Sequence, residues 1–215
     1  MNKLKKLVEK SCQVYYSRRQ SSDRHIVAFI HKNALINNFR HQMNFLENDR
    51  LLIANSLDRC VEDVSLEKKA VYTYAGLCDR NAMGVKFSGH RLDIRIDDPH
   101  GVTYDGKTSV YVGVHQMGLI YVVDTTTNLT DIFSTTPVGV RHLGFRSGSL
   151  LLHATLENGY IEMQSAVDIR YVVGYPGGGN GNHLGSLIKT QTGILYGFTE
   201  VEEGVWILAN RRYNR

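Results

Sequence analysis

Apolar residues in this chain fall into short runs of four to seven positions, separated by clusters of Gly, Asp, Asn and Ser. The runs are rich in Val, Ile, Tyr and Leu, which favour extended backbone, and their length is typical of strands joined by tight turns. Residues 1–11 depart from this pattern, because Leu4, Leu7 and Val8 share one face at helical spacing. The pattern therefore predicts a short N-terminal helix or arm followed by an all-β chain.

One strand-and-turn unit recurs along the sequence. Gly106, Gly148 and Gly193 each end a turn, and a second glycine turn follows 11 or 12 residues later. Equivalent turns lie 41 to 45 residues apart. Glycine suits these positions because tight hairpin turns need a positive φ angle. A fainter copy of the unit covers residues 42–76, "QMNFLENDRLLIANSLDRCVEDVSLEKKAVYTYAG".

A four-stranded unit that repeats at about 40 residues predicts a small β-propeller, whose blades stack radially because one blade cannot cover its own apolar faces. About five blades of this size fit the 215 residues. We expect residues 25–215 to form the propeller, with an insertion loop at 77–98 that projects from one face. We expect residues 1–24 to form a basic arm or to supply a strand that closes the ring.

The segments "LLIANSLDRCVEDVSLEKKAVYTYAG" and "DDPHGVTYDGKTSVYVG" resemble NHL-repeat propellers and their relatives. The resemblance covers roughly residues 45–125, and residues 140–208 more loosely. The sequence departs from the NHL pattern at Asn55 and near Val114 or His115, where those repeats usually carry an aspartate. The resemblance implies a propeller and leaves the function open, because propellers host many unrelated roles.

Composition narrows the classes of function only slightly. The net charge is +4, and the basic residues concentrate in "NKLKKLVEK", "SRRQSSDR" and "NRRYNR", which favours solvated ends over a nucleic-acid surface. No apolar run approaches the roughly 20 residues of a membrane helix, and no apolar stretch follows the basic N-terminus as in a secretory signal. The sequence therefore predicts a cytoplasmic protein, or one carried within a larger assembly such as a virus particle.

The three cysteines are predicted to be ordinary thiols. Cys12, Cys60 and Cys78 are an odd number and show no CxxC spacing, so neither a disulfide framework nor a zinc–thiolate site is expected.

Four histidines recur at the start of the innermost predicted strands, with spacings of 59, 42 and 41 residues: His41, His100, His142 and His183. They are consistent with hydrogen bonds that hold each blade together, with a polar rim that binds a ligand, or with one divalent transition metal held by neutral imidazoles. No acidic residue recurs beside them to orient the second ring nitrogen, and this weighs against a metal.

No serine nucleophile elbow, recognisable Cys/His pair or dinucleotide fingerprint is present. The predicted function is therefore a non-enzymatic binding or assembly module without a cofactor. It would contact a protein or a glycan through one face, as a homo-oligomer or as a structural component of a virion or another large complex. Inter-blade loops carry recognition in propellers, so the expected partner contacts lie in the insertion: Arg80, Lys86, His90 and Arg91.

Two alternative functions stay open at the level of sequence. The first is a metal-assisted lyase or hydrolase that uses the channel histidines, which the resemblance allows because NHL-like propellers include such enzymes. The second is an RNA-binding propeller, a role that the resemblance also allows. The scattered Lys and Arg positions favour it less, because RNA binding would depend on a gathered basic face.

Overall fold

The computed structural model describes the backbone of residues 12–17, 26–31, 40–47, 49–81, 86–136, 139–146, 150–155, 160–164, 169–173, 195–202 and 205–210. It describes side chains within 41–46, 49–81, 86–136, 139–145 and 197–198. Within these ranges the regular elements are all strands. The described chain accordingly contains no helix that is long and apolar enough to cross a membrane. The helix expected over residues 1–11, and His183, lie outside the described residues.

Three sheets contain at least four strands each, and every strand pair in them is antiparallel. The first consists of β3 (Arg40–Glu47), β4 (Arg50–Asn55), β5 (Cys60–Ser65) and β6 (Ala70–Ala75). The second consists of β8 (Pro99–Tyr104), β9 (Ser109–Val114), β10 (Leu119–Asp124) and β11 (Leu129–Thr135), with the short β7 (Gly89–His90) added beside β11. The third consists of β12 (Val140–Arg146), β13 (Leu150–Thr155), β14 (Tyr160–Gln164) and β15 (Ile169–Val173).

Two further strand pairs flank these sheets. They are β1 (Cys12–Ser17) with β2 (Ile26–His31), and β16 (Leu195–Glu202) with β17 (Val205–Asn210). The predicted four-stranded unit is confirmed in the three complete sheets. The count of five blades, and the closing of the ring by a strand from residues 1–24, stay predictions.

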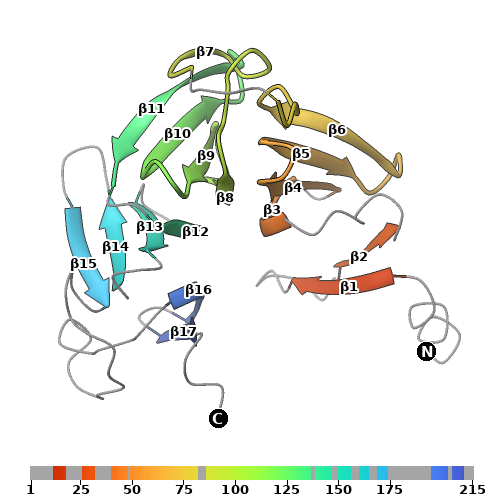
Figure 1. Ribbon diagram of the computed structural model, residues 1–215. Coiled ribbons are helices and arrows are strands. Elements are labelled where there is room, and N and C mark those ends of the chain that lie inside the picture. The colour runs from red at the N-terminus through yellow and green to blue at the C-terminus, as the bar shows by residue number, and fades with distance from the viewer. Residues whose placement is uncertain are drawn as a thin grey trace, which may run out of the picture.

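The sheets are arranged radially. Figure 1 shows that they fan around a common centre, with β3, β8, β12 and β16 nearest to it and β6, β11 and β15 outermost. The innermost strands touch in sequence, because β3 contacts β8, β8 contacts β12, and β12 contacts β16. This arrangement matches the stacked blades that the repeat predicts.

Both faces of strand β4 are buried, which explains why its residues 51–54 read as an unbroken apolar run. In β4, Leu52 and Ala54 join the core cluster that fills the space between the first and second sheets. Leu51 and Ile53 point to the opposite face and form a separate cluster. Successive side chains of a strand alternate between faces, so a blade covered on both sides needs apolar residues at every position.

The second and third sheets pack closely beside the axis. Ile120, Val140 and Leu143 are fully buried between them, and aromatic side chains extend this cluster outward. Gly101 lies at the tightest approach, where an added Cβ would be 2.8 Å from Leu143 Cγ. A larger residue at position 101 would therefore push β8 away from β12.

The turn between β8 and β9 has the chemistry that its Asp-Gly sequence predicts. Gly106 has a φ of 78°, in the left-handed region that favours glycine. The carboxylate of Asp105 accepts hydrogen bonds from the backbone N–H groups of Lys107 (2.7 Å) and Ser109 (3.0 Å). These two bonds fix the register in which β9 returns along β8.

One buried side chain joins the innermost strands of all three sheets. Gln42 projects from β3, and its Oε1 accepts hydrogen bonds from the backbone N–H of Val102 in β8 (3.1 Å) and of Leu143 in β12 (2.7 Å). Its Nε2 donates to the backbone carbonyl of Leu143 (2.5 Å) and lies 3.3 Å from His142 Nε2. The amide therefore satisfies backbone groups that sheet hydrogen bonds leave open at the axis.

One end of the sheets carries the features considered below. We call it the histidine face and define it by the starts of β3, β8 and β12, where His41, His100 and His142 lie. Neighbouring strands are antiparallel, so the β4–β5 turn (56–59), the β9–β10 turn (115–118) and the two ends of the segment 77–98 lie at this same end. The middle of that segment runs to the start of β11, at the other end of the second sheet.

Replacing Gln42 is expected to destabilise the protein strongly. Gln42→Leu would leave two backbone N–H groups and one carbonyl buried without a partner, and we expect a loss of about 2–4 kcal/mol in the free energy of unfolding. The matched control is Asn44→Ala, because Asn44 on the same strand makes one half-buried hydrogen bond, to Thr103 Oγ1 (3.2 Å). We expect about 1 kcal/mol or less for the control by chemical denaturation. Equal losses in the two variants would contradict the role given to Gln42.

Candidate functional site

Two of the four predicted histidines lie in direct contact at the centre of the histidine face. The rings of His41 and His100 are stacked, with centroids 3.5 Å apart and planes inclined by 20°. The structure adds a third histidine, because His115 from the β9–β10 turn stacks on the other side of His100 at 4.4 Å. The site therefore contains a row of three imidazoles from two blades.

A single carboxylate holds two of these rings. Asp98 Oδ1 accepts a hydrogen bond from His100 Nε2 at 2.9 Å, and Asp98 Oδ2 lies 3.4 Å from His115 Nδ1. The backbone carbonyl of Asp98 also accepts the backbone N–H of His115 at 3.1 Å. Asp98 alone therefore orients both His100 and His115.

The carboxylate also fixes which ring nitrogens carry protons. An ionised carboxylate only accepts hydrogen bonds, so His100 is protonated at Nε2 and His115 at Nδ1 when both rings are neutral. The remaining nitrogens, His100 Nδ1 and His115 Nε2, are buried and find no hydrogen-bond partner among the described residues. Buried polar atoms left in this state are uncommon and often mark a functional site.

The electrostatics of the cluster keep His41 and His100 neutral and the Asp98 carboxyl ionised. Desolvation, together with the neighbouring His100, lowers the pKa of His41 to about 4. Burial also lowers the pKa of His100, although Asp98 opposes that shift. Burial would raise the pKa of Asp98, but the hydrogen bonds from His100 and His115 outweigh it and hold that pKa well below its usual value. At neutral pH the cluster therefore offers imidazole lone pairs beside one negative charge.

The other two predicted histidines do not join this cluster. His142 lies next to Gln42, and its ring meets the edge of Phe198 from β16 with centroids 4.9 Å apart. Its neutral ring accepts from the Gln42 amide, so this hydrogen bond joins the first and third sheets. His183 lies outside the described residues. Among the described residues, His41, Asp98 and His100 form a group that can hold a metal, because each offers one ligand atom and these atoms lie within 4.8 Å of one another.

The segment 77–98 is more firmly anchored than a projecting loop. Ile94 and Ile96 are buried in the core between the first and second sheets. Arg91 lies 4.7 Å over the ring of Tyr74 and donates to Asn128 Oδ1 at 2.7 Å. The middle of the segment adds β7 to the edge of the second sheet.

The four residues predicted to contact a partner fall into two groups. Arg91 is used within the fold, and Arg80 donates to Asp58 Oδ1 at 2.6 Å although its side chain is half exposed. Lys86 and His90 are exposed on the segment. Leu77, Phe87 and Leu92 are large apolar side chains that are also exposed on it, and they were not among the predicted contacts.

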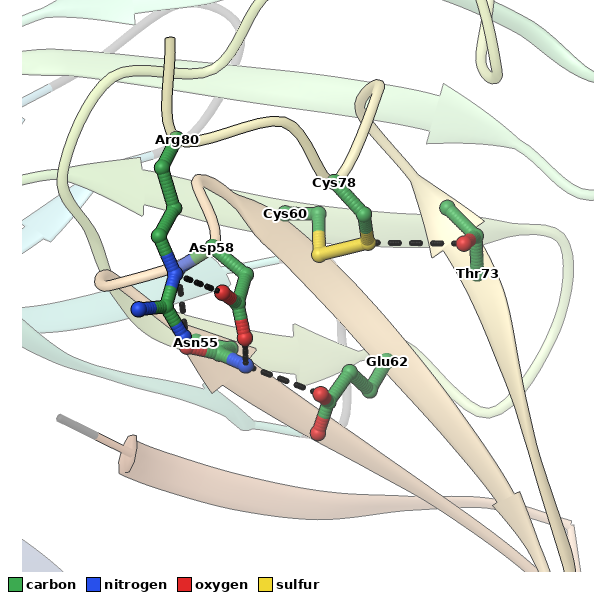
Figure 2. The surroundings of a disulfide bond; sticks show 7 residues. All are labelled: Asn55, Asp58, Cys60, Glu62, Thr73, Cys78 and Arg80. Carbon is green, nitrogen blue, oxygen red and sulfur yellow. Dashed lines mark hydrogen bonds and ion pairs between the residues drawn. A yellow bond between two sulfur atoms is a disulfide. The ribbon is translucent and has the colours of Figure 1, made fainter. Parts of the chain in front are cut away.

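The prediction that all three cysteines are thiols is wrong, because Cys60 and Cys78 form a disulfide (Figure 2). The register of the β5–β6 hairpin explains the pairing. Val61 lies opposite Ala75, so the start of β5 and the residues after β6 are neighbours. The two cysteines are 18 residues apart and enclose one hairpin, a signal that the odd count obscured.

A polar network lies beside the disulfide (Figure 2). The side-chain amide of Asn55 donates to Asp58 Oδ2 and to Glu62 Oε1, both at 2.8 Å. Asp58 in turn accepts from Arg80, two residues after Cys78. The disulfide and this ion pair together fix the start of the segment 77–98 against the β4–β5 turn.

Comparisons with solved structures show likeness at the level of fold. A structural-genomics protein from Bacteroides thetaiotaomicron matches with a TM-score of 0.64 and 11% identity, over 92% of this chain and 54% of that chain. The nidogen/laminin complex matches with 0.50 and 14%, over 69% and 52%. An auxiliary nutrient binding protein from Bacteroides thetaiotaomicron matches with 0.51 and 15%, over 76% and 40%. No family profile and no curated protein sequence matches.

These likenesses and the radial sheets identify the fold as a β-propeller, in agreement with the NHL-like resemblance of the sequence. The chain spans about half or less of the length of the structures named above. At these identities the comparisons show the fold alone.

Removing the disulfide is expected to destabilise the protein by about 3 kcal/mol, the loop-closure entropy of a loop of this length. Cys78→Ser should show this loss in chemical denaturation. The control is the unmodified protein with reductant, which should match Cys78→Ser without it. Peptide mapping without reduction should recover a linked Cys60–Cys78 pair. Finding both thiols free in protein made under oxidising conditions would contradict the structure.

Acid is expected to weaken the fold through His142. Burial lowers the pKa of His142 to about 4 from the usual 6.5. Between these values the unfolded chain takes up a proton that the folded chain does not, so stability falls as the pH drops from 6.5 to 4. The loss from this group is at most about 3 kcal/mol.

His142→Gln should make this decline shallower, because glutamine still offers an acceptor to Gln42 and does not titrate. Urea unfolding across this pH window measures the slope for each protein. The same slope in wild type and variant would show that His142 does not carry the effect.

Proposed function

We propose that the chain is a non-enzymatic binding module whose segment 77–98 contacts a protein partner. The observation that supports this most directly is the segment 77–98, which presents exposed apolar side chains from an anchored backbone. Leu77, Phe87 and Leu92 are 43%, 50% and 38% exposed. Large apolar side chains that gather on one surface segment often mark a protein contact.

The anchoring of the segment supports binding because an anchored backbone loses less conformational entropy when a partner binds. The disulfide fixes one end of the segment, β7 fixes its middle, and Ile94 and Ile96 fix its other end in the core. A rigid surface of this kind binds more tightly than a mobile loop that presents the same side chains. Lys86 and His90 add polar contacts on the same segment, and Arg80 joins them as part of its ion pair with Asp58.

A protein partner is favoured over a glycan by the aliphatic character of the exposed side chains. Sugars stack on exposed aromatic rings and need dense hydrogen bonding, whereas two of the three exposed apolar residues of the segment are leucines. A place in a virus particle or in another large assembly stays a prediction that rests on the basic N-terminal residues 1–11, which lie outside the described residues. Self-association and RNA binding likewise stay predictions.

The disulfide favours an oxidising compartment over the cytoplasm that the sequence predicted. Structural disulfides persist in secreted, luminal and cell-surface proteins and are kept reduced in the cytosol. We therefore propose that the module works outside the cytosol.

The alternative of a metal-assisted lyase or hydrolase has one observation in its favour, the cluster of His41, Asp98 and His100. It needs a bound metal with a coordination position open to a substrate. It also predicts that loss of the metal abolishes turnover, which binding through the segment 77–98 does not require.

Exchanging one exposed ring tests the binding surface. Phe87→Ser in the segment should abolish recovery of the partner when the protein is cross-linked in its native source. The matched control is Tyr72→Ser in β6, because Phe87 and Tyr72 are each 50% exposed. The control should recover the same partner as the wild type, and both variants should keep wild-type stability because neither ring is buried. Loss of the partner in Tyr72→Ser, or its retention in Phe87→Ser, would contradict the proposal.

A further inference from the structure

Three ligand atoms converge at the centre of the histidine face. His41 projects from the start of β3, Asp98 precedes β8, and His100 lies in β8. Their candidate donor atoms all lie within 4.8 Å of one another. We propose that these three residues bind a zinc ion. This site does not depend on the protein-binding role of the segment 77–98.

The Asp98–His100 pair already has nearly the spacing of two ligands on one ion. Zinc–nitrogen and zinc–oxygen bonds of about 2.0–2.1 Å place neighbouring ligands of a tetrahedral ion about 3.4 Å apart. His100 Nε2 and Asp98 Oδ1 are 2.9 Å apart, so an ion between them needs them to separate by only about 0.5 Å. The ring of His41 is stacked on His100 and bonded to Ser56 Oγ at 3.1 Å, so it must leave this stack and turn to place a nitrogen on the ion. Because His41 is exposed, this turn does not disturb the core.

The chemistry of the three ligand atoms suits a cation. Neutral imidazole nitrogens and a carboxylate oxygen are groups that bind zinc, and His41, His100 and Asp98 supply them. When an ion takes the place of the proton between His100 and Asp98, that proton moves to His100 Nδ1. This nitrogen is the buried atom that has a free lone pair and no partner among the described residues. Coordination therefore needs no net loss of a proton.

The surroundings support this ligand set. Asp98 Oδ2 lies 3.4 Å from His115 Nδ1, which keeps the carboxylate turned toward the cluster as partners of metal ligands commonly do. The charge of Asp98 offsets the repulsion between a cation and Arg141, which lies close enough to lower the pKa of His41 and His100. Two nitrogens and one carboxylate oxygen favour zinc over calcium or magnesium, which prefer oxygen ligands.

The site would leave one coordination position open. Three protein ligands plus one water or ligand oxygen is the usual composition of a zinc site that acts on, or grips, a second molecule. His41 lies on the exposed side of the cluster, so the open position faces solvent at the histidine face. The fourth ligand would therefore be water, or an oxygen atom of whatever molecule this face binds.

Zinc binding to the full chain tests the proposal. After removal of metals with a chelator, titration calorimetry with zinc alone should give one ion per chain. His41→Ala and Asp98→Asn should each bind at least about tenfold more weakly. Asparagine suits position 98 because Asp98 has a φ of 50°, which asparagine tolerates, and His41 is exposed, so both variants should fold. Zinc should raise the melting temperature of the wild type and not that of His41→Ala.

The control is His90→Ala, because His90 is an exposed histidine of the segment 77–98 that is not among the three ligands. Its zinc affinity should match that of the wild type, and an excess of calcium should not compete. A wild-type protein that binds no zinc at micromolar concentration would overturn the proposal. Unchanged affinity in His41→Ala and Asp98→Asn, or an equal loss in His90→Ala, would also overturn it, because the ion would then bind elsewhere.

Discussion

The propeller depends on how the innermost strands meet at the axis, where no neighbouring strand is available to pair with their free backbone groups. Gln42 resolves this constraint at one point. Its single amide reaches from β3 to the backbone of β8 and β12, which are 60 and 101 residues further along the chain. Because three sheets share one buried polar side chain, their relative positions are coupled. Each blade then has both faces covered, as a sheet of four short strands requires.

The functional features follow from that coupling. Once β3 and β8 are fixed side by side, His41 and His100 lie at the same height and stack on each other. Asp98, from the segment that precedes β8, then bonds to the ring of His100. The segment 77–98 begins and ends at the same end of the sheets, and the Cys60–Cys78 disulfide holds its start against the β4–β5 turn. Its middle runs along the outer edge of the second sheet to the start of β11.

Much of the fold could be predicted from the sequence because its physical cause is local. Glycine turns and apolar runs at a fixed interval are visible without coordinates, and they gave the four-stranded unit, the radial packing and the alignment of His41 with His100. The repeat of histidines did not show which of the four lie together in one cluster. His142 has the same place in its blade, but its ring is hydrogen-bonded to Gln42. These two residues are 100 positions apart, so no periodicity in the sequence shows their contact.

The features that could not be predicted from the sequence occur once along the chain and are not part of the repeat. Asp98 and His115 occur once, and they meet the histidines only because the β9–β10 turn lies at the same end as the start of β8. The disulfide was missed because a count of three cysteines argued against pairing, whereas the hairpin between Cys60 and Cys78 brings them together. The position of Asp98 two residues before His100 was the signal in the sequence that could have found the cluster.

The most direct test of the account is whether Gln42 touches two other blades in solution. Nuclear Overhauser spectroscopy on the full chain can detect contacts between the side-chain amide protons of Gln42 and the backbone amide protons of Val102 and Leu143. The account predicts cross-peaks to both, together with slow solvent exchange of those two backbone protons. Cross-peaks to neither, or rapid exchange of both protons, would contradict the meeting of β3, β8 and β12 at one axis.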